Sequence, residues 1–546
     1  MKYLIILPVV VVCLFFGLPY IAAVAPIFSA TAVNVSYVAG IATWTLMQAF
    51  LSACLALLLG IPGAWFLSGE GGGRFARVFR QVLNALGALP FALPPILVAL
   101  MFALFFGNSG WLNSALALIL HTDEVPLHIL YRPSAIILAH AFYNFPLFIR
   151  LCGDALKNVR NAYSASAYSL GSKPIGLFFR VCLPLILPAV FSAFLLAFLY
   201  SLGSFAIVLV LGGGPAASTL SVEIYRYARI TLHFPQAALL ALIETVFCIS
   251  VFLVYNFFSQ KSTTQIAGQR NSVKHFTYPF AKKENSFLIL YALFILLFVG
   301  GPFLTIFVES ALKFNPSFPL HSLFAALGRS IVLALLASSF SVILAICAQL
   351  DSKWGKEILP PSPCGRGWGR GAYASLNIIM NAPLFSSGIV LGLGFIALYG
   401  RTFSRSLIAV ALAQAVLALP FAYNSIKEGF RSCPLSLLHA AASLGAGPWK
   451  RLLTIQIPLA ARTIRSAFAF SALISLGELN MPMMLGLQNF ETLPLYIYRA
   501  VGSYRYAAAA LAGVVLLCAA SLTLFTLNMA SRKAAKKISW RLGGFA

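Results

Sequence analysis

Long apolar runs separated by short polar or basic loops occupy nearly the whole chain. A bilayer core about 30 Å thick is crossed by about 20 helical residues at 1.5 Å each. By this length test we expect twelve transmembrane helices, and lipid favours helices because they satisfy their own backbone polar groups. The predicted spans lie near 4–26, 42–67, 84–106, 134–152, 183–210, 236–258, 286–310, 328–350, 375–400, 406–426, 463–487 and 507–529. The predicted fold class is therefore an all-α polytopic membrane protein.

Composition supports a membrane protein, and the placement of the charges gives its orientation. Of 546 residues, 60% are hydrophobic and only 9% charged, against about 25% charged in soluble proteins. The net charge of +25 is compatible with nucleic acid, anionic lipid or cytoplasmic loops. When the N-terminus is placed inside, most Lys and Arg fall on inside loops, as the positive-inside rule requires. We therefore predict cytoplasmic N- and C-termini, a lipid bilayer as surroundings and no nucleic acid as a partner.

Several alternative chemistries find no support in the sequence. The first apolar run, near 4–24, is longer than the apolar region of about 7–15 residues in a signal peptide, so we predict an uncleaved span. The nine cysteines lack the spacing of a zinc site or a disulfide framework, and no metal site is predicted. Because no Gly-x-x-x-x-Gly-Lys-Ser/Thr stretch occurs, we expect no ATP site on this chain.

The two halves repeat at a shift of 274 residues. Gly171 corresponds to Gly445, and Pro184 corresponds to Pro458. Six spans per repeat is an even number, so both repeats enter the membrane in the same direction. The predicted organisation is a first repeat at 1–258, a cytoplasmic linker at 259–285 and a second repeat at 286–546. A Gly/Pro-rich insertion at 359–371 is expected to be flexible and without function, the alternative being a regulatory or partner-binding loop.

A matched motif lies on the inside loop between the fourth and fifth spans of each repeat, at about 153–182 and 427–462. The first copy is Ala165-Ser-Ala-Tyr-Ser-Leu-Gly171 and the second is His439-Ala-Ala-Ala-Ser-Leu-Gly445. In each copy a Pro follows the Gly by 13 positions, as Pro184 and Pro458. This pattern predicts a short helix that Gly ends, followed by a span that Pro opens.

With these loops the chain resembles the membrane permeases of binding-protein-dependent ABC importers, although Ala165 and His439 stand where that family often has Glu. The resemblance implies a type I importer with the MetI-like permease fold in a bacterial inner membrane. It also implies that this subunit is not an enzyme and binds no cofactor, since ATP and Mg belong to a partner ABC ATPase dimer. A solute-binding protein is the second implied partner. The residues expected to contact the ATPase are Ala165, Ser166, Ala167, Gly171, Phe178 and Pro184, and His439, Ala440, Ala441, Gly445, Leu452 and Pro458.

The substrate is predicted from two further segments. Residues 211–225 and 492–505 resemble the fused permeases for thiamine, and ferric iron is the alternative. A carboxylate inside a membrane is costly and usually faces the protein interior. We therefore place Glu478 and its first-repeat counterpart Ser204 on the translocation path, and we add the aromatic residues Tyr225 and Tyr498, whose rings can stack on a flat heteroaromatic solute or cover a cation. The alternatives are a packing hydrogen bond for Glu478 and ordinary interfacial positions for the tyrosines.

Other residues and other protein classes are given less weight. Glu244 and His140 are expected to form hydrogen bonds that fix helix packing. Arg226 and Arg499 are expected to pair with a docking protein or with lipid phosphates. A secondary transporter would also show twelve spans, but it would not need the matched inside loops. No constellation of side chains supports a membrane enzyme.

Overall fold

A computed structural model describes residues 2–29, 34–69, 74–212, 214, 217–268, 282–313, 320–349, 368–486 and 490–523. Within these ranges the chain is helical and forms no strand. Ten helices are long and apolar enough to cross a membrane, or up to twelve if each of two bent helix pairs is one span. The bent pairs are Ser375–Leu384 with Gly388–Gly400, and Trp449–Leu459 with Ala461–Gly477. The all-α polytopic fold is confirmed, and the ten helices and two bent pairs overlap the twelve predicted spans.

The chain divides into two compact units that do not coincide with the sequence halves. The first-repeat unit consists of Ala30–Asn315 and Ala500–Leu511. The second-repeat unit consists of Met1–Ser29, Pro316–Arg499 and Ala512–Ala546. The first span of each repeat therefore packs within the unit that the other repeat builds. The ranges 1–258 and 286–546 describe repeats in the sequence and are not the compact bodies.

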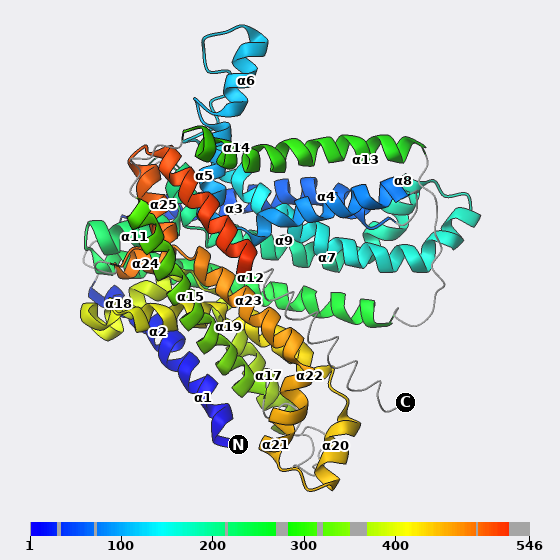
Figure 1. Cartoon of the computed structure of the whole chain (residues 1–546), viewed down its shortest axis with the longest axis vertical. Coiled ribbons are helices and arrows are strands. Elements are labelled where there is room, and N and C mark those ends of the chain that lie inside the picture. The colour runs from blue at the N-terminus through cyan, green and yellow to red at the C-terminus, as the bar shows by residue number, and fades with distance from the viewer. Residues whose placement is uncertain are drawn as a thin grey trace. The chain divides into compact units, whose positions relative to one another are not determined.

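In the first-repeat unit, α3 packs against α7 and α9 to form the centre of the helix bundle. Figure 1 shows α13 extended alongside α4, which it contacts. The helices of this unit are α3 (Val35–Leu67), α4 (Arg74–Ala92), α5 (Pro95–Phe106), α6 (Trp111–Leu120), α7 (Pro133–Ser169), α8 (Pro174–Leu177), α9 (Leu183–Leu202), α10 (Ala206–Leu211), α11 (Leu220–Tyr225), α12 (Phe234–Gly268), α13 (Lys282–Ile295) and α14 (Gly301–Leu312).

The exchanged span of the first-repeat unit, α13 with α14, is held by aromatic packing and close backbone approach. The Phe298 ring lies edge-to-face with Phe142, with centroids 5.5 Å apart. A Cβ on Gly301 would lie 2.7 Å from the Phe105 ring, so a larger residue there would require this ring to shift. The Tyr291 hydroxyl also donates to the Leu59 carbonyl over 3.0 Å. These contacts make the first span of the second repeat part of this unit's core.

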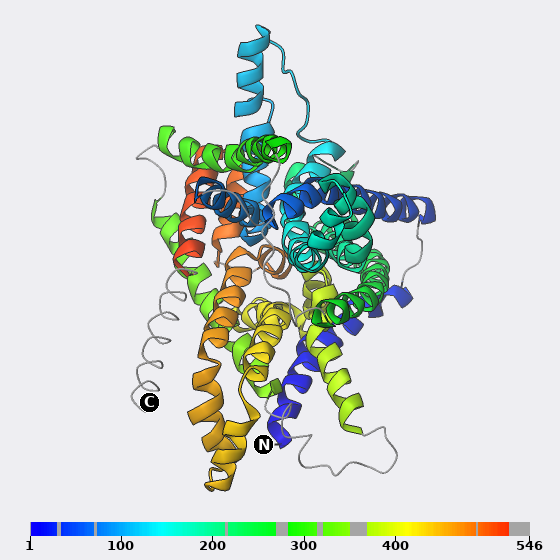
Figure 2. The same ribbon diagram turned by 90° about the vertical axis from the view of Figure 1, so that its right-hand side faces the viewer.

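In the second-repeat unit, α15 packs against α19 and α23, and the exchanged helices α1 and α2 lie against α15 and α18 (Figures 1 and 2). Phe15 stacks on Tyr399, whose hydroxyl donates to the Leu14 carbonyl over 2.7 Å. The helices are α1 (Lys2–Val12), α2 (Leu18–Val24), α15 (Leu320–Gln349), α17 (Trp368–Asn381), α18 (Gly388–Ser404), α19 (Leu407–Arg431), α20 (Leu435–Ser443), α21 (Pro448–Arg451), α22 (Ile457–Leu459), α23 (Ala461–Gly477), α24 (Asn480–Leu485) and the start of α25 (Leu493–Gly502).

Four spans carry a π-helical turn that ends two residues before a proline. A proline inside a helix lacks an N–H group and crowds the preceding turn, and the wider π turn gives it room. The turns are η1 (Cys13–Gly17), η3 (Phe178–Cys182), η6 (Leu296–Gly300) and η8 (Leu452–Gln456), followed by Pro19, Pro184, Pro302 and Pro458. These prolines are therefore accommodated within continuing helical structure.

Four predicted spans are interrupted, and one of them, near 375–400, is the bent pair Ser375–Leu384 with Gly388–Gly400. The span near 84–106 breaks between α4 and α5, because Pro94 has extended backbone and Pro95 opens α5. The span near 183–210 ends as α9 at Leu202, before the separate short helix α10. The span near 463–487 likewise ends as α23 at Gly477, before α24.

Two predicted segments lie partly outside the described residues. Of the linker at 259–285, residues 259–268 continue α12 and residues 282–285 begin α13. Residues 269–281 are not among those the structure describes. Of the insertion at 359–371, only 368–371 are described, as the start of α17. The roles proposed for both segments stay predictions.

Candidate functional site

The two motif loops have nearly identical backbone geometry. Gly171 and Gly445 both have φ of 78°, the left-handed conformation that favours glycine. The N–H groups of Gly171 and of the next residue turn back to the carbonyls of Tyr168 and Ala167, at 2.9 and 3.0 Å. In the second repeat the corresponding distances, to the carbonyls of Ala442 and Ala441, are both 2.9 Å. Each loop therefore closes its helix with the same paired backbone bonds, known as a Schellman motif.

Each motif loop also presents apolar side chains to the outside of its unit. Leu170 and Leu444, just before the glycines, are each 87% exposed. Two further exposed pairs occur at the same shift of 274, namely Ile175 with Trp449 and Phe179 with Leu453. We call these six residues the apolar tips. Exposed apolar side chains at repeated positions suit contact with another protein or with lipid.

The expected small residues lie near the tips, but the helical structure after each glycine begins earlier than predicted. Ala165, Ser166, His439 and Ala440 are exposed, and Ala167 and Ala441 are partly buried. Pro184 and Pro458 are the second residues of α9 and α22, but these helices continue the π turns before them without a break. The helical structure after each glycine begins earlier, at Pro174 and Pro448, three residues after the glycine.

Two further residues assigned to the coupling loops face the helix bundle. Phe178 packs edge-on against Trp65 at 5.1 Å. Leu452 is only 3% exposed and belongs to the core of the second-repeat unit. These two positions anchor the loops, and neither lies at the tips.

The two copies also differ. In the first repeat the motif is the end of α7, a single helix of 37 residues that includes the fourth span. In the second repeat α19 ends at Arg431 and a separate helix, α20, begins after Pro434. A proline disfavours helical conformation in the residue before it. The short helix predicted for both repeats therefore exists as a separate element only in the second.

Glu478 lies where the fifth span of the second repeat breaks, between α23 and α24. Its Oε1 accepts hydrogen bonds from the N–H groups of Asn480 at 2.9 Å and Met481 at 3.3 Å. This is N-cap geometry, and a carboxylate at a helix N-terminus is favoured by the helix dipole. Ser204 occupies the equivalent break, between α9 and α10, and is half-buried. Whether either residue contacts a solute stays a prediction.

The two path tyrosines lie on helices that follow these breaks. Tyr225, at the end of α11, packs edge-on against Phe205 at 5.3 Å. Tyr498 is half-buried on α25. These rings are partly engaged in packing, and their place on the path stays a prediction.

A repeated hydrogen bond, missed in the sequence, anchors α11 and α25. The Leu220 N–H donates to Thr45 Oγ1 at 3.1 Å, and the Leu493 N–H donates to Ser330 Oγ at 2.7 Å. In each repeat a hydroxyl of the second span thus holds the first residue of the helix after the break. The repeated Thr-Leu pair at 219–220 and 492–493 marked this position in the sequence.

The charged residues singled out from the sequence mostly find partners inside their own units. Ser221 Oγ donates to Glu244 Oε1 at 2.7 Å, which is the packing hydrogen bond expected for Glu244. Arg226 forms an ion pair with Glu223 at 2.6 Å, and Arg499 forms one with Glu491 at 3.0 Å. Both arginines thus have a partner within their own unit, and their pairing with a docking protein or with lipid stays a prediction.

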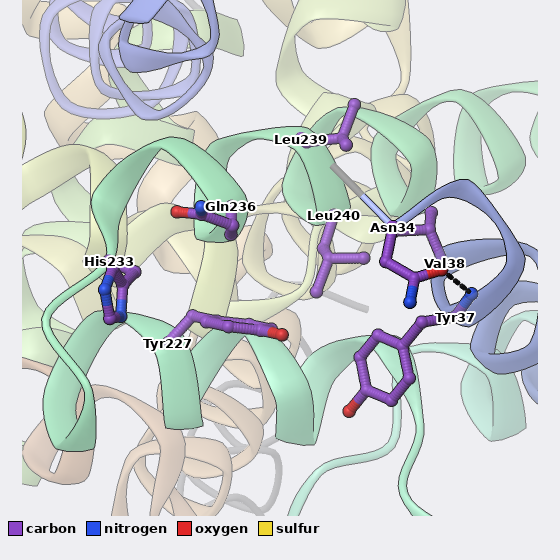
Figure 3. A pocket seen from close by; sticks show the side chains of 8 residues that line it. All are labelled: Asn34, Tyr37, Val38, Tyr227, His233, Gln236, Leu239 and Leu240. Carbon is purple, nitrogen blue, oxygen red and sulfur yellow. Dashed lines mark hydrogen bonds between the residues drawn. The ribbon is translucent and has the colours of Figure 1, made fainter. Parts of the chain in front are cut away.

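A pocket of about 250 Å³ opens in the first-repeat unit between the start of α3, the turn after α11 and the start of α12 (Figure 3). Figure 3 shows the Tyr227 ring nearly edge-on, below Gln236 and Leu240. Tyr37 lies on the opposite side and donates from its hydroxyl to Glu223 Oε2 at 3.0 Å. None of the predicted path residues lines this pocket.

Two repeats of apolar spans, each with a broken fifth span and a matched motif loop, are typical of a membrane transport subunit. The chain belongs to the family described as binding-protein-dependent transport system inner membrane component, which matches residues 56–264 and 365–535. It is thus the multi-pass permease subunit of a binding-protein-dependent importer.

Individual relatives extend over most of the chain. The thiamine transport system permease protein ThiP of Escherichia coli (strain K12) is 29% identical over 492 residues, which cover 88% of this chain and 87% of the relative. ThiP of Brucella abortus (strain 2308) is 28% identical over 521 residues, covering 93% and 91%. The probable sulfate transport system permease protein cysT of Helicosporidium is 29% identical over 212 residues, covering 39% of this chain and 74% of that protein.

Proposed function

We propose that this chain is the membrane subunit of an ATP-driven importer for thiamine or its phosphates. The observation that carries the proposal is the pair of motif loops, which share backbone geometry and apolar tips in a chain similar to ThiP along about nine-tenths of its length. Other solutes, ferric iron first among them, remain the alternative substrates. Substrate choice also depends on the binding protein that delivers the solute.

The partner ATPase, with its ATP and Mg, is proposed to bind at the apolar tips of the two motif loops. Leu170 and Leu444 suit a hydrophobic groove, because burying an exposed leucine contributes about 1.5–3 kcal/mol. A helix seated in a partner's groove moves as a rigid body with it. Closure of the ATPase dimer would thereby move the fourth and fifth spans of each repeat.

The transport cycle proposed is alternating access. A loaded binding protein docks on the outer face, ATP binding closes the ATPase dimer, and the two units open outward to receive the solute. Hydrolysis then restores the inward-facing state. This cycle requires the N-terminus and both motif loops to lie in the cytoplasm, which the distribution of Lys and Arg supports.

The test is uptake of labelled thiamine and of labelled ferric iron by cells with and without this chain, before and after ATP depletion. Thiamine uptake that needs both the chain and ATP is the expected result. Iron uptake in place of thiamine would keep the importer and change the substrate. Uptake that survives ATP depletion but collapses with the ion gradient would indicate a secondary transporter and contradict the proposal.

A further inference from the structure

Four polar side chains are buried together at the centre of the first-repeat unit, where α3, α7 and α9 meet. Gln48, Asn144 and Ser201 are fully buried, and His140 is 1% exposed. We call these four residues the polar cluster. Buried polar groups without hydrogen bonds cost about 1–3 kcal/mol each, so each donor and acceptor here should have a partner.

The amide of Gln48 determines which nitrogen of His140 carries the proton. Gln48 Nε2 donates to two carbonyls, those of Thr45 at 3.2 Å and Ser201 at 3.0 Å. Both N–H bonds are then used, and Oε1 remains as an acceptor. This oxygen lies 3.1 Å from His140 Nδ1. His140 must therefore donate from Nδ1, which leaves Nε2 of the neutral ring as an acceptor.

Asn144 presents a second acceptor one helical turn along α7. Its Nδ2 donates to Ser201 Oγ at 3.0 Å and to the Ala197 carbonyl at 3.4 Å. Its Oδ1 has no hydrogen-bond partner in the part of the chain that the structure describes, and neither has His140 Nε2. Residues four apart lie on one face of a helix. The two residues that carry these buried acceptors therefore share that face, and the described residues supply a donor to neither.

We propose that α3, α7 and α9 hold one water molecule that donates to His140 Nε2 and to Asn144 Oδ1. A water molecule has two O–H donors, one for each acceptor, and the Ser201 hydroxyl proton is available to donate to its oxygen. Three hydrogen bonds are usual for a water buried in a protein. The site takes a small neutral donor, and it does not depend on which solute the protein transports.

The water site helps to fix the position of the broken fifth span. Ser201 lies one residue before the end of α9, and its carbonyl accepts from Gln48. The cluster therefore ties the break that contains Ser204 to the second and fourth spans. At the equivalent positions of the second repeat stand Gln414, Ala418 and Ser475. There Ser475 Oγ donates directly to Gln414 Oε1 at 2.5 Å, and no second acceptor replaces Asn144.

Solid-state NMR of the full-length chain in lipid bilayers, labelled with ¹⁵N-histidine, tests this proposal. The expected spectrum has His140 protonated at Nδ1 and unprotonated at Nε2, with a cross-peak from water protons to Nε2. The chain has seven histidines, and His140→Gln identifies the signals. A variant that keeps His140 and replaces the other six gives the assignment independently.

Three variants separate a water site from packing alone. Asn144→Leu should remove the water cross-peak and leave the proton on Nδ1, because Gln48 still accepts it. Gln48→Leu should remove the acceptor of the Nδ1 proton, so that His140 is no longer held in the form protonated at Nδ1. Gln414→Leu, the matched control in the second repeat, should change neither signal. A wild-type His140 protonated at Nε2, or one without a water contact, would overturn the proposal, and the wild-type spectrum decides this if a variant fails to fold.

Discussion

Gly171 and Gly445 are single residues on which the shape of each motif loop depends. A side chain at φ of 78° costs about 1–2 kcal/mol, and neither glycine has another atom within 4 Å of a Cβ position. The constraint is therefore conformational and not steric. The sequence predicted these two glycines as helix ends because they repeat at one shift.

The first prediction concerns Gly445→Val, with Gly447→Val as its control. A Cβ on Gly447 would also meet nothing within 4 Å, and Gly447 has no positive φ, so a side chain is tolerated there. The Gly445 variant should reduce co-purification of the partner ATPase about tenfold. This corresponds to a loss of about 1.4 kcal/mol of binding free energy when the exposed leucine of the loop is misplaced. Equal ATPase recovery from the two variants would contradict the proposed binding site.

The second prediction separates two roles of Glu478. Glu478→Gln keeps an oxygen that can accept from Asn480 and Met481 but removes the carboxylate, whereas Glu478→Ala also removes the cap, at about 1 kcal/mol. We expect the Gln variant to assemble with normal thermal stability and to transport less. Undiminished uptake by Glu478→Gln, alongside a destabilised Ala variant, would show that Glu478 is only a helix cap.

At the scale of elements, the breaks and the π turns limited what the sequence could predict. Apolar length locates a span, but it does not reveal that a span stops at Leu202 or at Gly477. The prolines at 184 and 458 suggested helix starts, because a proline at a first turn and a proline after a π turn look alike in sequence. The repeated Pro174 and Pro448, three residues after the glycines, contained the missing information.

The third prediction tests whether the apolar tips bind the partner ATPase. Leu170→Glu with Leu444→Glu should abolish ATPase co-purification and ATP-dependent uptake, because two charges would be buried in an apolar groove. Leu118→Glu, at a residue 76% exposed on α6, is the control and should leave the ATPase bound. If the double variant retained a full complement of ATPase, the tips would not be the docking surface.

For the whole molecule, the exchange of first spans was beyond what the repeat could predict. The repeat gives equal halves in sequence, whereas the choice of packing partner depends on contacts between residues far apart, such as Tyr399 with Leu14. Each compact unit therefore forms only when both repeats are present, either in one chain or as two separate halves. Fold class and number of spans followed from local composition, which long-range packing does not alter.

The fourth prediction measures the exchanged packing in the second-repeat unit. A Cβ on Gly394 would collide with the Pro19 backbone, so Gly394→Ala should destabilise the chain by about 1–3 kcal/mol. Gly328→Ala is the control within α15, where a Cβ meets nothing within 4 Å. It should stabilise by up to about 1 kcal/mol through helix propensity. Thermal unfolding of the purified chain measures whether each variant is more or less stable than the wild type. If Gly394→Ala lost no more stability than Gly328→Ala, the close approach of Gly394 to Pro19 would be refuted.

The unbroken α7 and the interrupted α19 and α20 have a mechanical consequence. A helix of 37 residues is about 55 Å long. A displacement of the motif loop at the end of α7 therefore moves the whole helix, including its end on the far side of the membrane. In the second repeat, the break at Pro434 lets α20 bend relative to α19, so less of the same displacement reaches α19. Equal displacements of the two motif loops would therefore move the fourth spans of the two repeats by different amounts.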